Sequence, residues 1–532
     1  MPKPPASDEI TPEVKLPRDR VAGVLLHPTS LPGPHGIGDL GPGATAFVDF
    51  LARAEQRLWQ ILPLGPVGAG DSPYAARSAL AGNPLLISLD ALARDGLLSP
   101  SEVAQIPQQT GPVDYAAATR LKLPLLRRAY GARQRASSAS RAELEEVAAA
   151  NSGWLGDWAL YAALRERFGG KGWWEWPPEL VAREASALAR AESDLRDEVD
   201  FQRFVQLLFF RQWGALREHA RELGIRIIGD MPIFVALDSA DVWARPELFK
   251  LARGRRQGAV AGVPPDYFSK TGQLWGNPVY DWEAMSRDGY DWWIERVRGA
   301  LETVDIIRLD HFRGFQAYWE VPASEKTAVK GKWMPGPRED LFAAIERALG
   351  PVQFIAEDLG LITPDVHALR EKLGFPGMRI LLFAFGDDAH NPYLPHSYEQ
   401  NTVAYTGTHD NDTVRGWFDS ADEALRHRVR SYLWTDGRNV AWDFIHAVHA
   451  SVADWAIVPA QDLLGLGNEA RMNVPGKFGG NWSWRLRPGQ LADRVGQSLA
   501  DMTRTYGRAP KPPEVARAEE GEEDAAALAE PA

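Results

Sequence analysis

The chain has 532 residues, and 59 Lys and Arg against 71 Asp and Glu give a formal net charge of −12, which argues against nucleic acid or an anionic membrane surface as a partner. Cysteine is absent, which excludes disulfides, thiol catalysis and cysteine-ligated metal centres, and no apolar run is long enough to cross a membrane. With 45% hydrophobic residues, the composition predicts a soluble, cytoplasmic protein with a large core.

Both ends of the chain differ in composition from the middle. Residues 1–18 are polar and rich in proline, and residues 509–532 are acidic and contain few large hydrophobic side chains. Segments of this kind cannot bury enough apolar surface to fold. We therefore expect two disordered tails that flank a catalytic body over residues 19–508.

Short apolar runs that end in polar, Gly or Pro residues indicate buried parallel strands. Eight such runs occur, at residues 21–26, 58–64, 225–230, 305–310, 353–358, 378–385, 402–407 and 455–460. Most are separated by segments with apolar residues at helical spacing, and alternating strands and helices form parallel sheets. The count of eight predicts an α/β fold of the (β/α)₈ TIM-barrel type, and a doubly wound sheet is the alternative.

Two of the gaps between these runs are longer than an ordinary connection. Residues 94–200 have helical spacing, mainly at 120–135, 141–150 and 158–168, and we expect an inserted helical subdomain there. Residues 237–282 are rich in Gly, Pro and aromatic side chains, which favours a long ordered loop at the active site.

Four acidic residues lie at the carboxyl ends of predicted strands: Asp230, Asp310, Glu357 and Asp410. A single acid in such a place is most often a helix cap or a ligand of loop amides. Catalytic groups of barrel enzymes, however, converge at this end of the strands. The presence of four acids there therefore favours an active site.

The surroundings of two of these acids differ in sequence. Arg308 and Asp310 are two apart on one strand, so their side chains share a face, and the guanidinium favours the ionised carboxylate. Glu357 has no basic neighbour in sequence, and an apolar pocket would raise its pKa toward that of a general acid. One ionised and one protonated carboxyl is what retaining glycoside chemistry requires. The sequence leaves two choices open, namely Glu357 or Asp358, and Asp410 or Asp412.

Other motifs carry weaker signals. Gly36, Gly38 and Gly41 match a dinucleotide-binding fingerprint, but three prolines lie between the strand end and Gly36, which argues against that site. Residues 409–412 could ligate a metal, yet no zinc or calcium motif is present. We therefore expect neither a metal nor a cofactor.

Aromatic side chains gather in the predicted loops, and the chain has as many Trp residues as Phe residues, 20 of each. The loop aromatics are Tyr74, Tyr267, Phe268, Trp275, Trp482 and Trp484. Flat rings of this kind stack on sugar faces. His311 and His409 flank two of the acids, and we expect them to contact substrate hydroxyls.

Several segments resemble those of one enzyme family. They are HPTSLPGPHGIGDLG from His27, LPLGPVGAGDSPY from Leu62, GDMPIFV from Gly229, VPPDYFSKTGQLWGNP from Val263, IRLDHFRGF from Ile307, IAEDLGLITP from Ile355, YTGTHDND from Tyr405 and EARMNVPGKFGGNWSWR from Glu469. Together they resemble amylomaltases, the 4-α-glucanotransferases or disproportionating enzymes of the α-amylase superfamily, over about residues 20–508. The resemblance implies a (β/α)₈ barrel without a C-terminal β-sandwich. It also implies maltooligosaccharides and starch or glycogen-type α-glucans as substrates.

The same resemblance implies roles for individual residues. Asp310 would be the nucleophile, Glu357 the general acid and base, and Asp410 the stabiliser of the transition state. The residues implied in substrate binding are Tyr74, Asp230, Arg308 and His409 at the cleavage point, Trp275 with Ser72 and Asp387 on the acceptor side, and Tyr267 and Phe268 in a loop over the cleft. Ala69 stands where relatives often have an aromatic residue, which argues against a remote glucan site there.

Two other functions fit the same residues. An α-glucan hydrolase would use the same three acids, and a non-catalytic glucan-binding protein would usually have lost one of them. The sequence leaves open the oligomeric state and the preferred chain length of the glucan.

Overall fold

The computed structural model describes residues 19–136, 143–146, 149, 151–252, 255–265, 269–477 and 479–510. The predicted tail 1–18, most of the predicted tail 509–532 and part of the predicted helix 141–150 lie outside these ranges. Tyr267 and Phe268 also lie outside the described residues.

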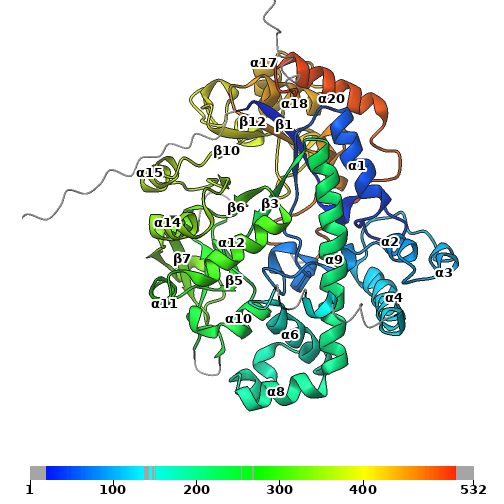
Figure 1. The fold of residues 1–532 in the computed structure, drawn as a ribbon. Helices are drawn as coiled ribbons and strands as arrows, with labels where there is room; N and C mark the ends of the chain where they lie inside the picture. Colours follow the sequence, from blue (N-terminus) through cyan, green and yellow to red (C-terminus); the bar gives the residue numbers. More distant parts are fainter. Residues whose placement is uncertain are drawn as a thin grey trace, which may run out of the picture.

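A single sheet of eight parallel strands forms the centre of the molecule (Figure 1). In spatial order its strands are β10 (Gly377–Ile380), β11 (Thr402–Tyr405), β12 (Trp455–Pro459), β1 (Val21–Leu25), β2 (Leu58–Gln60), β3 (Arg226–Met231), β6 (Ile306–Leu309) and β9 (Phe354–Ala356). All eight predicted apolar runs are thus strands. Their residues are almost entirely buried, because helices cover the outer face and side chains fill the interior.

The sheet closes between β9 and β10. The amide of Ala356 donates a hydrogen bond to the carbonyl of Pro376 (2.9 Å), just before β10 begins. The amide of Met378 donates to the side chain of Asp358 at 2.7 Å. These two bonds join the outer strands and complete the (β/α)₈ barrel.

Helices follow most of the strands, as the sequence predicts. Their bounds are α1 (Pro42–Arg53), α2 (Leu89–Arg94), α3 (Pro100–Ala104), α4 (Tyr115–Ala136), α6 (Leu155–Arg167), α7 (Pro178–Val181), α8 (Ala185–Asp194), α9 (Arg196–Glu222), α10 (Ala240–Ala244), α11 (Trp282–Arg287), α12 (Asp291–Thr303), α13 (Arg313–Gln316), α14 (Arg338–Leu349), α15 (Pro364–Lys372), α16 (Val414–Ser420), α17 (Glu423–Leu433), α18 (Val440–Ala450), α19 (Ala460–Leu463) and α20 (Asp493–Thr505). Helix α1 starts with Pro42 at its first position and buries Phe47, Phe50 and Leu51 toward the barrel.

Helices α2 to α9 all lie between β2 and β3, in and beyond the predicted insertion. Figure 1 shows α9 running from this group along the barrel, and it contacts both α6 and α1. Trp173 and Trp176 are buried in this region.

A second sheet, which the sequence analysis does not predict, stands beside the barrel. Its antiparallel strands, in spatial order, are β5 (Gln273–Pro278), β4 (Ala259–Val263), β7 (Ala317–Pro322) and β8 (Lys332–Pro335). Two of them belong to the predicted loop 237–282, which therefore contains a hairpin. The other two follow β6, so this sheet joins the connections after two neighbouring barrel strands.

Within the described part of the chain, no helix combines the length and apolar character needed to span a membrane. After β12, the described residues contain only helices and loops, so the barrel is not followed by a β-sandwich there.

Candidate active site

The strand register brings the predicted acids together at the carboxyl end of the barrel. Asp230 on β3 lies opposite Arg308 on β6. The last pair between β6 and β9 is Leu309 with Ala356, and the next residues along these strands are Asp310 and Glu357. The two proposed catalytic carboxyls therefore leave the barrel from adjacent strands at the same level.

Arg308 is the centre of this group. One guanidinium nitrogen, Nη1, donates to both carboxylate oxygens of Asp230 at 2.7 and 2.8 Å and to Asp310 Oδ1 at 3.1 Å. The side chain of Arg308 is only 4% exposed and that of Asp310 is 28% exposed. The Nε atom of Arg308 faces the sulfur of Met378 on β10 at 3.4 Å. Arg308 thus fixes the orientation of the nucleophile candidate from inside the barrel.

Burial raises the pKa values of both carboxyls. The pKa of Asp310 rises to about 7, because burial and the charges of Asp230 and Asp410 outweigh Arg308. Arg308 therefore favours the ionised form, as predicted, but does not lower the pKa below its usual range. Burial raises the pKa of Glu357 to about 8, against the opposing effect of Arg308. Both carboxyls therefore hold a proton to higher pH than an exposed Asp or Glu would.

The structure distinguishes Glu357 from its neighbour Asp358. The oxygens of Glu357 accept hydrogen bonds from the amides of His311 (2.7 Å) and Leu359 (2.9 Å). His311 has a φ of 53°, a left-handed conformation that is costly for a non-glycine residue and is typical of functional sites. Asp358 is buried at the closure of the barrel, where it binds Met378. Glu357 is therefore the residue that faces the site.

Asp410 and Asp412 also differ in their contacts. Asp410 Oδ1 accepts a hydrogen bond from Asn473 Nδ2 at 2.6 Å, and the charge of Asp410 acts on Asp310. Asp412 instead accepts bonds from the amide of Thr413 and from the side chain of Asn468. The geometry therefore favours Asp410 as the third acid of the site.

Aromatic rings form one wall of the group. The hydroxyl of Tyr74 donates to Asp230 Oδ2 at 2.8 Å, and its ring stacks on His409 with centroids 5.1 Å apart. The ring centroid of Trp482 lies 5.8 Å from that of Tyr74 and 6.0 Å from that of His409. Ser72 caps the turn that carries Tyr74 by accepting a bond from its amide at 3.2 Å. These rings offer a flat face beside the acids.

Trp275 approaches the group from the second sheet. It lies on β5, is 37% exposed, and contacts the ring of His311 edge to face with centroids 4.7 Å apart. Asp387 follows β10 and is exposed, and its carboxylate accepts a bond from the amide of Asp388. The role of Asp387 stays a prediction of the sequence.

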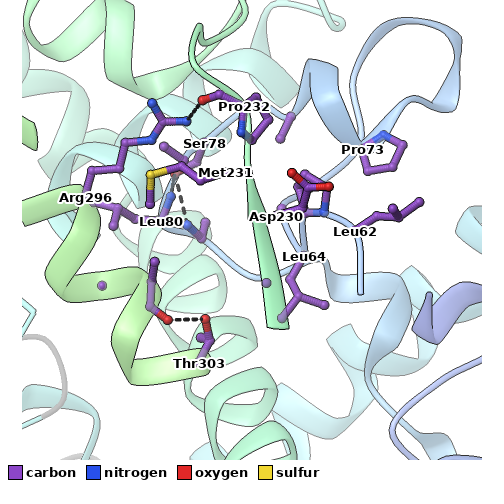
Figure 2. Close-up of a pocket in the computed structure, with 18 of the residues that line it drawn as sticks. Leu62, Leu64, Pro73, Ser78, Leu80, Asp230, Met231, Pro232, Arg296 and Thr303 are labelled. Carbon is purple, nitrogen blue, oxygen red and sulfur yellow. Dashed lines mark hydrogen bonds between the residues drawn. The ribbon is translucent and has the colours of Figure 1, made fainter. Parts of the chain in front are cut away.

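A separate cavity of about 100 Å³ lies behind Tyr74 and Asp230 (Figure 2). Apolar residues such as Leu62 and Met231 line it, and Arg296 closes its far side. Asp310, Glu357 and Asp410 are not among its lining residues. It therefore adjoins the site at Tyr74 and Asp230 and is not the place where the acids meet.

Sequence reasoning missed two of the contacting residues. Asn473 binds Asp410 across 63 residues of chain, and Met378 supports Arg308 from β10. Asn473 lies in the segment from Glu469 that resembles amylomaltases. This resemblance was the one sequence signal that pointed to Asn473. Among the described residues, no group of three or more His, Asp or Glu side chains is arranged to hold a metal ion.

Comparison with known proteins gives a consistent result. The family model described as 4-alpha-glucanotransferase matches residues 26–491. The 4-alpha-glucanotransferases of a Synechocystis species and of Thermus thermophilus are both 50% identical to this chain over 92% of its length, covering 98% and 99% of those proteins. A solved amylomaltase from Streptococcus agalactiae is 40% identical, with a TM-score of 0.90 over 92% of this chain and 100% of that one. The chain belongs to the 4-alpha-glucanotransferase family.

Proposed function

We propose that this 4-α-glucanotransferase works by a retaining double displacement on α-1,4-glucans. Its substrates would be maltooligosaccharides and starch or glycogen-type chains, and the acceptor would be the 4-hydroxyl of a glucose or glucan. One observation carries the proposal: an arginine-bound carboxylate, Asp310, leaves the barrel beside Glu357, a carboxyl whose pKa is raised by burial. The acarbose complex of the Streptococcus agalactiae amylomaltase supports a sugar-binding cleft in a protein of this fold.

In the first step, Asp310 attacks the anomeric carbon of the donor sugar while Glu357 gives its proton to the glycosidic oxygen. The glycosidic bond breaks, the leaving glucan departs with a new hydroxyl, and an ester joins the donor to Asp310. In the second step, the acceptor hydroxyl loses its proton to Glu357 and attacks the same carbon. The ester breaks, and two inversions leave the α configuration unchanged.

The other charged and aromatic groups support these steps. Positive charge develops on the sugar ring in the transition state, and the side chain of Asp410 would stabilise it. Arg308 holds Asp310 and Asp230 together, so Asp310 stays oriented toward the sugar. Tyr74 and His409 form a stacked pair against which a sugar ring would lie, and buried Asp230 holds Tyr74 in place by accepting its hydroxyl.

Transfer requires that the acceptor sugar wins over water. Trp275 presents a partly exposed ring over His311, next to the ester position, and such a ring can hold an incoming glucose by stacking. A held acceptor places its hydroxyl near the anomeric carbon. Water has no comparable binding site and is displaced by the sugar.

Incubation of the purified protein with maltotriose tests this function. A transferase forms chains longer than maltotriose while the total of reducing ends stays constant. A hydrolase releases new reducing ends and forms only shorter chains, and a binding protein leaves maltotriose unchanged. Asp310→Asn serves as the control that should be inactive in both respects. The cytoplasmic location stays a prediction of the sequence.

A further inference from the structure

A second, smaller cavity lies behind His409, at the carboxyl ends of three adjacent strands, β11, β12 and β1. Its volume is about 20 Å³, enough for one water molecule. His27, His409 and Gln461 contribute polar groups to its wall, among apolar residues such as Leu26 and Met472. A cavity with several polar groups and this size is suited to a single bound water.

The two histidines of this cavity have complementary hydrogen-bonding states. The amide of Leu62 donates to His27 Nδ1 at 3.2 Å, so this nitrogen is an acceptor and the proton of neutral His27 must lie on Nε2. His409 is 7% exposed, and its Nδ1 is buried without a hydrogen-bond partner among the described residues. The residue with this donor and the residue with an unpartnered buried nitrogen thus line the same small space.

Both imidazoles are neutral at physiological pH. Burial, together with the nearby His409, lowers the pKa of His27 to about 3. Burial also lowers the pKa of His409, and the charge of Asp410 only partly opposes this effect. A neutral imidazole carries its proton on one of two nitrogens, so the tautomer of His409 depends on what its Nδ1 meets.

Of the other polar residues around the cavity, Asp462 is already engaged and Gln461 fits a water. Asp462 accepts bonds from Thr406 (2.6 Å) and from the amide of Val414 (2.9 Å). Gln461 donates through Nε2 to the carbonyl of Ala470, which leaves its Oε1 as an acceptor. A water here would accept from His27 Nε2–H and donate to His409 Nδ1 and to Gln461 Oε1. That arrangement uses three of the bonds a buried water usually makes.

We propose that this cavity binds one water molecule, and that His27 is a positioning residue which fixes His409, through that water, as the tautomer protonated on Nε2. His409 Nε2, which lies 3.4 Å from Asp410 Oδ1, then carries the proton and is available as a donor to a sugar hydroxyl. This chain of hydrogen bonds starts at the backbone amide of Leu62, because that amide sets the tautomer of His27. The consequence for sugar binding rests on the proposed function, whereas the tautomer itself does not.

Nitrogen NMR of the full-length protein with ¹⁵N-labelled histidine tests the tautomer directly. His409→Gln identifies the signals of His409 by their loss. The matched variants are His27→Phe and His449→Phe, since His449 is equally buried but lies on α18. We expect pure Nε2–H His409 in the wild type and in His449→Phe, and a mixture of tautomers in His27→Phe. A wild-type His409 protonated on Nδ1, or a pure Nε2–H signal that persists in His27→Phe, would overturn the proposal.

A crystal structure of the wild-type protein at high resolution gives an independent test that needs no variant. Electron density for a water between the two imidazoles supports the proposal, and an empty cavity contradicts it. Activity separates the proposal from the assigned function. His27→Phe should lower kcat/KM for maltotriose roughly twofold to tenfold, the effect of one hydrogen bond, while His449→Phe should not. A changed tautomer with unchanged kcat/KM supports the water link and contradicts the role of His409 in sugar binding.

Discussion

Replacement of Glu357 by Gln removes the proton donor while keeping the size of the side chain. With a pKa of about 8, roughly ten of eleven molecules carry the proton on Glu357 at pH 7. At the ordinary value of 4.5, only about one in 300 would do so. By raising this pKa, burial keeps most Glu357 side chains protonated, as the first step requires. Loss of this proton donor in Glu357→Gln should lower kcat for maltotriose by about 10²-fold to 10⁴-fold.

A donor whose leaving group needs no proton, such as a maltosyl fluoride, tests the assignment. Ester formation from this donor should be nearly unaffected in Glu357→Gln. The alkaline fall of the wild-type kcat/KM near pH 8, where Glu357 loses its proton, should also be absent. Gln keeps only one oxygen for the amides of His311 and Leu359, so a melting curve must show that the variant is folded. Equal losses with both donors, or an alkaline fall that persists, would refute the reasoning.

Other variants separate the remaining roles. Asp310→Asn should stay folded by circular dichroism and lose several orders of magnitude in turnover, because an amide cannot form the ester; residual turnover near that of the wild type would rule out Asp310. Tyr74→Phe removes a hydrogen bond to the carboxylate of Asp230 and should lower kcat/KM about tenfold to hundredfold, which corresponds to about 1.5–3 kcal/mol, whereas an unchanged value would show that this bond does not matter for catalysis. Trp275→Ala should raise the ratio of hydrolysis to transfer from maltotriose, measured as reducing ends against longer chains, and an equal fall of both would make Trp275 a packing residue only. The folded state favours protonated Glu357, so its contribution to stability is lost as the pH rises from 4.5 through about 8. The Tm of Glu357→Gln relative to the wild type should therefore increase over that range, and a constant difference would contradict the raised pKa.

The barrel strands could be predicted from sequence because each is buried on both faces and reads as a continuous apolar run. The run at 58–64 extends beyond its strand, which ends at Gln60, and so does the run at 378–385. The strand of the latter run ends at Ile380, and Leu381–Phe383 form a turn of 3-10 helix, because apolar composition alone does not distinguish a strand from a buried helical turn.

The second sheet could not be predicted in the same way. Its strands are short, contain Gly and Pro, and are partly exposed, as in Gln273–Pro278. β4 joins Gln273–Pro278 to Ala317–Pro322, and its pairing of Gly262 with Trp319 spans 57 positions of chain (319 − 262), which local patterns do not connect. This pairing carries Trp275 to the site.

The acids were predictable as a group, because parallel strands end at one edge of the barrel. The choice between Glu357 and Asp358 was not, because it depends on the closure of the barrel at Met378. The pKa of Asp310 was also beyond the sequence, since the pattern shows Arg308 but not the burial that opposes it. Asn473 reaches Asp410 only through tertiary folding.

The identity of the nucleophile is the central claim, and trapping the covalent intermediate tests it most directly. Glu357→Gln is incubated with a maltosyl fluoride, so that the ester forms but its breakdown lacks a base. The protein is then digested and the labelled peptide is sequenced by mass spectrometry. We predict a maltosyl group on Asp310. A maltosyl group on another residue, such as Asp410, would contradict the account.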